Sequence, residues 1–142
     1  MTRQLLAEMI LPFPPSLNHY WRKDRGGMHI SEDGKKYIAR VQQLALLNGR
    51  GDTEYSLKVH QQPEKKQKLK VCAVFHCPDN ARRDLDNLFK VLFDCMTKAK
   101  VWHDDSQVFE IDALKLLKRD YTNGATEGWV SMEIYGEDEW AE

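Results

Sequence analysis

The stretch that decides the fold runs from Arg82 to Asp105 and reads RRDLDNLFKVLFDCMTKAKVWHDD. Its middle part carries apolar side chains at intervals of three and four residues, namely Leu85, Leu88, Leu92, Cys95 and Ala99. This spacing places them along one face of an amphipathic helix, which we expect from about Asp84 to Ala99. Further apolar residues widen this face, so we expect the helix either to meet a second subunit or to pack in a thick core.

Strands are expected on both sides of this helix. The segment Leu69–His76 reads LKVCAVFH and is rich in β-branched and aromatic residues, which is typical of a strand. Two more strands are expected after the helix, at Gln107–Lys118 and Trp129–Tyr135. Because Asn123-Gly124 lies between them, we predict that these two strands form an antiparallel hairpin with a long loop.

The N-terminal half predicts a strand followed by a helix. Gln4–Leu11 is apolar apart from one acid, and the prolines after it end the strand. Ser31 is a good N-cap for a helix that reaches about Leu47, and Ser56–Gln61 fits a short strand. The principal elements therefore follow the order β-α-β-α-β-β. We expect an α+β fold with a mixed, largely antiparallel sheet and helices packed on it.

Length and composition indicate one globular domain over residues 1–142, with an acidic, flexible tail at 136–142. The formal net charge is −1, but the last six residues are mostly acidic, so the rest of the chain is net basic. A run of about 18 apolar residues, as a membrane span requires, is absent from the sequence. The three cysteines do not form a disulfide framework, and the cytoplasm is the expected compartment.

The segment from Pro14 to His29 has neither a helical nor a strand period, so we expect an ordered loop. It combines aromatic and basic side chains, which is typical of a groove that follows a nucleic-acid backbone. We therefore predict DNA contacts from Asn18, Tyr20, Arg22, Lys23 and Arg25. An equally good interpretation is that Tyr20 and Trp21 cap the hydrophobic core.

The aspartates at the two ends of the central helix suggest a metal site. If the chain turns back after the helix, Asp105 can lie close to Asp84 and Asp86. Three neighbouring carboxylates repel one another unless a cation neutralises them, and oxygen ligands of this kind suit Mg²⁺ or Mn²⁺. Lys90, one turn beyond Asp86, would stabilise the charge that develops in a phosphodiester transition state. Spacing alone leaves the alternative of a helix cap and a turn.

Two segments of this sequence resemble the RusA family of Holliday junction resolvases. The run RRDLDNLFKVLFDCMTKAKVWHDDSQV is similar to that family's pattern RDLDN-L-K…D-L…W-DD-Q. The earlier segment PPSLNHYWR resembles its PPS-N-Y motif, and both segments occur in the family's order. The segment from Asn48 to Lys68 departs from the family by its greater length.

The resemblance implies a Mg²⁺-dependent homodimeric endonuclease that resolves four-way DNA junctions by paired symmetrical nicks. Carried over by position, the catalytic and metal-binding aspartates are Asp84, Asp86 and Asp105, and the catalytic lysine is Lys90. Two further residues that match the pattern are expected to have supporting roles, namely Asn87 and Asp104. Members of this family are often encoded by phages or prophages.

The two arginines before the catalytic stretch have two possible partners. Arg82 and Arg83 are predicted to contact DNA phosphates, and salt bridges to neighbouring acids are the alternative. Two other functions remain open from the sequence. One is an inactive protein that binds DNA junctions, and the other is a metal-dependent phosphohydrolase that acts on smaller substrates.

Overall fold

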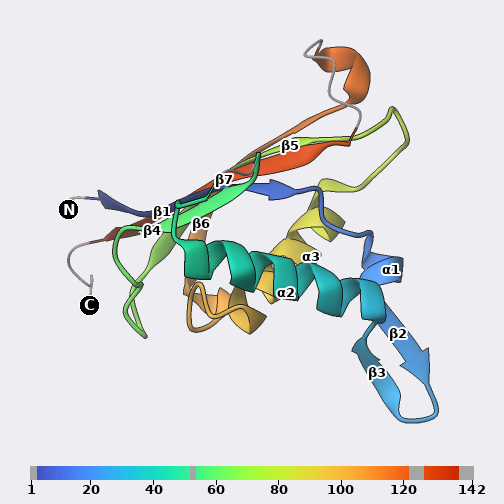
Figure 1. The fold of residues 1–142 in the computed structure, drawn as a ribbon, viewed down its shortest axis with the longest axis horizontal. Coiled ribbons are helices and arrows are strands. Elements are labelled where there is room, and N and C mark those ends of the chain that lie inside the picture. Colours follow the sequence, from blue (N-terminus) through green and yellow to red (C-terminus); the bar gives the residue numbers. More distant parts are fainter. Residues whose placement is uncertain (1–2, 52–53, 122–126, 138–142) are drawn as a thin grey trace.

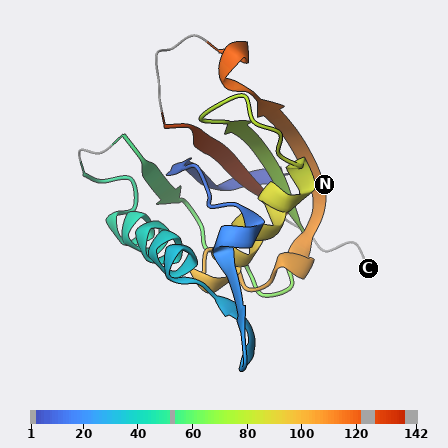
Figure 2. The same ribbon diagram turned by 90° about the vertical axis from the view of Figure 1, so that its right-hand side faces the viewer.

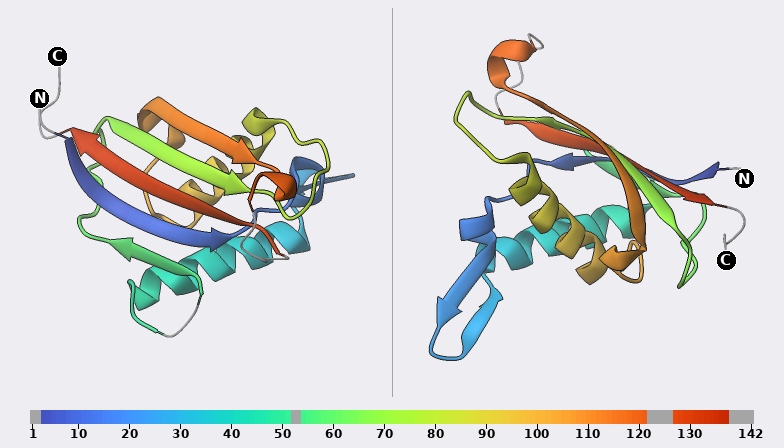
Figure 3. Two further views of the ribbon diagram at one scale, coloured as in Figure 1. Left: turned by 90° about the horizontal axis from the view of Figure 1, so that it is seen from above. Right: turned by 180° about the vertical axis from the view of Figure 1, so that it is seen from behind.

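The fold is built on one five-stranded sheet in the computed structural model, which describes residues 3–51, 54–121 and 127–137. The strands follow the order β4-β1-β7-β5-β6 across the sheet. Figure 1 and Figure 3 show the main helices on one face of this sheet, while the other face lacks a helical cover. The strands are β1 (Arg3–Pro12), β4 (Ser56–Val59), β5 (Leu69–His76), β6 (Val108–Leu116) and β7 (Trp129–Glu137). The helices are α1 (Leu17–Tyr20), α2 (Glu32–Leu47) and α3 (Leu85–Lys98).

The sheet is largely antiparallel, as the sequence predicts. β1 pairs antiparallel with β4 and β7, and β5 pairs antiparallel with β7. β6 instead pairs parallel with β5, because α3 carries the chain back along the sheet before β6 begins. The predicted β6–β7 hairpin is therefore wrong, since β7 lies between β1 and β5. The Asn123-Gly124 turn signal falls outside the described residues.

The core lies between the sheet and the helices. Alternate residues of β5 are fully or nearly buried, as the sequence pattern predicts for a strand with one face on the core. The predicted helix face is confirmed, since α3 buries Leu88, Leu92 and Cys95 against the sheet. Ser31 caps α2 by accepting a hydrogen bond from the Gly34 amide at 3.0 Å.

The segment from Pro14 to His29 is not a loop, which corrects the prediction. After the short helix α1, the chain forms an antiparallel ribbon from β2 (Trp21–Asp24) and β3 (Gly27–Ile30). This ribbon projects away from the sheet in Figure 1 and Figure 2. Its elements are about four residues each, too short for a sequence period to reveal them.

The tail predicted at 136–142 overlaps the last strand. β7 continues to Glu137, so Gly136 and Glu137 belong to the sheet, while residues 138–142 fall outside the described part of the chain. Within the part that is described, we find no helix with the length and apolar character needed to cross a membrane.

Candidate functional site

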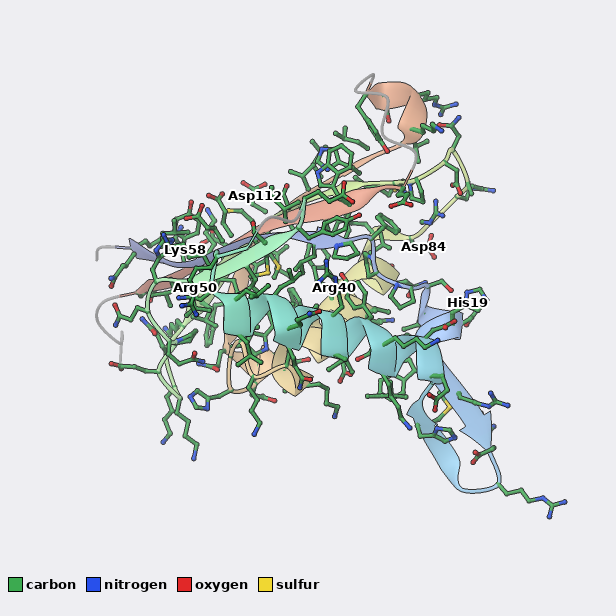
Figure 4. All side chains as sticks on the ribbon, viewed as in Figure 1. His19, Arg40, Arg50, Lys58, Asp84 and Asp112 are labelled. Atoms are coloured by element: carbon green, nitrogen blue, oxygen red, sulfur yellow. The ribbon has the colours of Figure 1, made fainter. Side chains whose placement is uncertain are left out.

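The two motif segments meet at a cavity of about 590 Å³ between α1 and the start of α3. From the first segment the cavity is lined by Ser16, Asn18 and His19, among others. From the second it is lined by Arg82, Arg83, Asp84 and Asn87. Figure 4 shows His19 and Asp84 at this end of the molecule. Residues about 65 positions apart in sequence thus form one site, next to the place where β5 ends.

Asp84 occupies the N-cap position of α3, but its side chain makes no capping hydrogen bond. An aspartate at this position ordinarily caps free backbone amides, which stabilises a helix by about 1 kcal/mol. Its exposed carboxylate is therefore free to bind another group. Asp86 follows in the first turn, with a carboxylate 3.9 Å from the Lys90 ammonium. Both of these side chains are more than half exposed, so the pair contributes little to stability.

Asp105 lies at the opposite end of α3 from Asp84 and Asp86, which corrects the expected geometry. It begins a short 3₁₀ turn, η1 (Asp105–Gln107), which comes directly before β6. Trp102 ties this region to the end of α3 through a 2.8 Å hydrogen bond from its indole N–H to Thr97. The 14 residues of α3 make a helix of about 21 Å, and that length separates Asp105 from the other two carboxylates.

The residues of one chain do not fit a three-carboxylate Mg²⁺ site. Free carboxylate oxygens such as those of Asp84 have the chemistry that Mg²⁺ requires. Over residues 3–51, 54–121 and 127–137, however, no three His, Cys, Asp or Glu side chains gather in a group that could hold a metal ion. A single chain therefore holds the expected metal ligands in two separate places, Asp84 and Asp86 at the start of α3 and Asp105 beyond its end.

Gln107 holds the turn that carries Asp105, and its structural role was not predicted. Its side chain is 5% exposed, and its amide donates to the carbonyls of Glu64 at 2.7 Å and Gln67 at 3.0 Å. Its carbonyl accepts from the amides of His103 and Asp104, each at 3.1 Å. A buried glutamine with all its polar positions used fixes the backbone around it. Its place in the W-DD-Q pattern was the only signal in the sequence.

Asp104 caps the same turn. Its carboxylate accepts hydrogen bonds from the hydroxyl and the backbone amide of Ser106, and these bonds lower the pKa of Asp104. Asp104 therefore stays ionised and orders the backbone next to Asp105.

Arg83 and Arg82 differ in their surroundings. The Arg83 guanidinium donates to both carboxylate oxygens of Asp79, at 2.7 and 3.3 Å, and lies 5.3 Å from the centre of the Phe13 ring. The hydrogen bond to Asp79 raises the pKa of Arg83. Arg83 therefore follows the salt-bridge alternative, although its partner is Asp79, an acid that the sequence did not single out. Arg82 is exposed beside the cavity.

Tyr20 is part of the core, which corrects its predicted contact with DNA. Its side chain is 0% exposed, and its hydroxyl donates to Asp94 at 2.6 Å. Burial, followed by the hydrogen bond to Asp94, raises the pKa of Tyr20 well above its ordinary value. A completely buried ring has no surface on which a base can stack, so the core interpretation holds for Tyr20.

The β2–β3 ribbon presents three exposed cations, Arg22, Lys23 and Arg25. The two strands are joined near the tip by an Asp24–His29 pair, with 2.6 Å between carboxylate and imidazole. The hydrogen bond between them raises the pKa of His29 and lowers that of Asp24. The ribbon is therefore a basic arm that extends beside α1 (Figure 1), the helix whose residues line the cavity.

His19 lines the cavity beside Asp84 and was not assigned a role from the sequence. Its Nδ1 atom is 2.8 Å from the Ser16 hydroxyl, and the ring is exposed. Its position within the PPSLNHYWR segment was the available signal.

Comparison with known proteins adds an independent finding. A sequence model of the family described as endodeoxyribonuclease RusA matches residues 12–124. The chain is 39% identical over 109 residues to the crossover junction endodeoxyribonuclease RusA of Escherichia coli strain K12. That match covers 75% of this chain and 79% of the relative. Proteins of the same name from Shigella sonnei and Enterobacteria phage 82 are 40% and 39% identical, with the same coverage. Both segments that line the cavity lie within the matched region.

Proposed function

Because the chain belongs to the RusA family of endodeoxyribonucleases, we propose that it is a Holliday junction resolvase that cuts four-way DNA by paired symmetrical nicks. The observation that carries this proposal is the cavity where the PPSLNHYWR and RRDLDN segments meet around the free carboxylate of Asp84. The likeness to the enzyme of phage 82 supports a phage or prophage origin.

Catalysis is assigned to Asp84, Asp86, Asp105 and Lys90. The three carboxylates are the proposed ligands of Mg²⁺ or Mn²⁺, and the bound ion would stabilise phosphate charge and lower the pKa of the attacking water. Lys90 lies one helix turn beyond Asp86 on the same face and would place its ammonium against the phosphate. Asn87, which lines the cavity, and Asp104, which caps the turn of Asp105, are proposed as supporting residues.

We use the word half-sites for the two groups of proposed ligands, Asp84 with Asp86 and Asp105 by itself. Their separation supports a site that two copies of the chain form together. The proposed homodimer is related by a two-fold axis, so that Asp105 of one copy lies beside Asp84 and Asp86 of the other. Two equivalent sites then cut two strands symmetrically. Within one chain, a helix of about 21 Å between the half-sites is far longer than the span of carboxylates bound to one ion at about 2.1 Å.

The edge strand β6 is the proposed dimer contact. It ends the sheet, and the apolar side chains of Phe109, Ile111 and Leu114 are 64%, 48% and 52% exposed. An exposed, apolar edge strand invites pairing with another strand. If β6 pairs antiparallel with its copy, the two α3 helices also run antiparallel on one face, which brings the start of one helix toward the end of the other.

DNA binding is assigned to two groups of residues. Arg22, Lys23 and Arg25 on the β2–β3 ribbon would contact phosphates, and so would Arg82 at the cavity, with Asn18 adding a polar contact. Arg83 remains a proposed phosphate ligand through the part of its guanidinium that Asp79 leaves free.

The test is cleavage of a synthetic four-way junction compared with plain duplex, with Mg²⁺ or with EDTA. We expect paired nicks in the junction that require Mg²⁺, and Asp86→Asn should abolish cutting while junction binding persists. Asp33→Asn is the matched control, because Asp33 is an exposed aspartate in the first turn of α2, a helix that carries no residue of the proposed site or dimer contact. Binding without cutting by the wild type would favour an inactive junction binder, and normal cutting by Asp86→Asn would refute the site.

A further inference from the structure

The connection between β5 and α3 is hydrogen-bonded to the end of β6 and to the residues that follow it. This connection spans residues 77–84 and leads directly to Asp84 at the start of α3. The backbone amide of Cys77 donates to the carbonyl of Leu116 at 2.9 Å, which continues the β5–β6 ladder. Further along, the amide of Arg119 donates to the side chain of Asn80 at 2.9 Å. Strand β6 therefore supports the segment that delivers Asp84 to the cavity.

Lys115 makes the contact nearest to Asp84. It lies in β6 opposite Phe75, a fully buried residue, on the side of the sheet that faces the helices. From there its ammonium donates a hydrogen bond to the carbonyl of Arg83. Since that carbonyl and the amide of Asp84 belong to one planar peptide unit, the contact fixes the orientation of the backbone at Asp84.

This orientation matters because, within the described part of the chain, no hydrogen bond or ion pair holds the Asp84 side chain. Its carboxylate makes no capping bond to α3, so the backbone decides the direction in which it enters the cavity. Lys115 is half-buried, and a hydrogen bond from an ammonium is about twice as strong as a neutral one. The salt bridge of Arg83 with Asp79 at 2.7 Å joins two residues within the same connection.

We infer that Lys115 is a positioning residue for Asp84: its bond to the Arg83 carbonyl aims the catalytic carboxylate at the cavity without touching the substrate. The inference rests on the proposed nuclease function and assigns Lys115 neither DNA nor metal as a ligand. A displacement of about 1 Å in a catalytic group costs up to about 100-fold in rate, so a loss of this bond should appear in the cutting step.

The experiment uses the full-length protein and three variants. Lys115→Met keeps the apolar stem and removes the donor, and Lys115→Arg restores a donor that can reach the carbonyl. Lys70→Met is the matched control, because Lys70 is a half-buried strand lysine whose ammonium instead contacts Glu110 at 3.0 Å. Single-turnover cutting of a synthetic junction, junction affinity without Mg²⁺ and the melting temperature are measured for each protein.

For Lys115→Met we expect a cutting rate about 10- to 100-fold lower, with junction affinity within about twofold of wild type. Lys115→Arg should recover at least part of the rate, and Lys70→Met should retain it. Amide hydrogen exchange at residues 84–88 should become faster in Lys115→Met alone. If Lys115→Met does not fold, Lys115→Leu replaces it, since leucine also lacks a donor, and the same outcomes apply.

A wild-type cutting rate in Lys115→Met would overturn the inference. So would losses of rate, affinity and melting temperature that match those of Lys70→Met, because they would indicate a purely structural role. A lack of junction cutting by the wild-type protein would instead refute the proposed function, so the two failures are distinguishable.

Discussion

A mixture of two inactive variants tests whether each catalytic site is shared between two chains. Asp86→Asn and Asp105→Asn are each expected to abolish cutting, because every site in either homodimer lacks one carboxylate. In a mixed dimer with shared sites, both substitutions fall in one site and the other site is intact. If each chain instead carried its own complete site, both sites of the mixed dimer would lack one carboxylate, and activity would not return.

The expected recovery follows from the two-fold symmetry. Random exchange in an equal mixture gives about one half mixed dimers. Once purified, these dimers each have one intact site of two, so their nicking should reach about one half of the wild-type rate. The products should be single nicks in place of paired resolution. The structural reason is the position of Asp84 and Asp105 at opposite ends of α3, which has 14 residues and spans about 21 Å.

The assay combines differently tagged copies of the two variants, exchanges subunits by unfolding and refolding, and purifies the mixed dimer through both tags. Nicking is then measured on a synthetic four-way junction with Mg²⁺. The control mixes Asp86→Asn with Asp33→Asn, which lies on α2 outside the proposed site and should be fully active alone. Nicking by purified Asp86→Asn/Asp105→Asn dimers no greater than that of the single variants would refute the shared site.

Three further outcomes are expected. Tyr20→Phe should lower the free energy of unfolding by about 1–3 kcal/mol, because it leaves the half-buried Asp94 carboxylate without its 2.6 Å hydrogen bond. Thermal melting should show this loss, and junction affinity should not change. Gln107→Ala should cost at least about 2 kcal/mol in urea unfolding, since four backbone groups lose their partner. The pKa of His29, followed by NMR, should lie above its ordinary value and fall in Asp24→Asn. The stabilising effect of this pair should be lost as pH rises through the raised pKa of His29, and also as pH falls through the lowered pKa of Asp24.

Elements with a strong local pattern were predictable from the sequence. The strand Leu69–His76 was predicted with its observed bounds, because alternate apolar side chains meet the core. The helix over 85–98 was predicted from its apolar stripe, and the start of α2 from the cap at Ser31. In each case the sequence pattern that predicts the element lies within the element's own residues.

Long-range relations were not predictable in this way. The pattern of β6 fits a parallel and an antiparallel neighbour equally well, and the choice is made by α3, which returns the chain before β6 begins. The same return carries Asp105 away from Asp84, although their sequence motifs suggest a meeting. Tyr20 was ambiguous because an aromatic ring beside cations has the same sequence pattern in a core and in a DNA groove.

Strand β6 connects the proposed dimer to both half-sites. Lys115, near its end, holds the peptide before Asp84, and Gln107, just before its start, holds the turn of Asp105. If β6 is also the strand that pairs with a second copy, the register of that pairing sets the distance between Asp105 of one chain and Asp84 of the other. A slip of two residues moves the half-sites by about 6.8 Å, which is more than any carboxylate side chain can span. Substitutions on the β6 edge that shift this register should therefore abolish cutting in dimers that still form and still bind DNA.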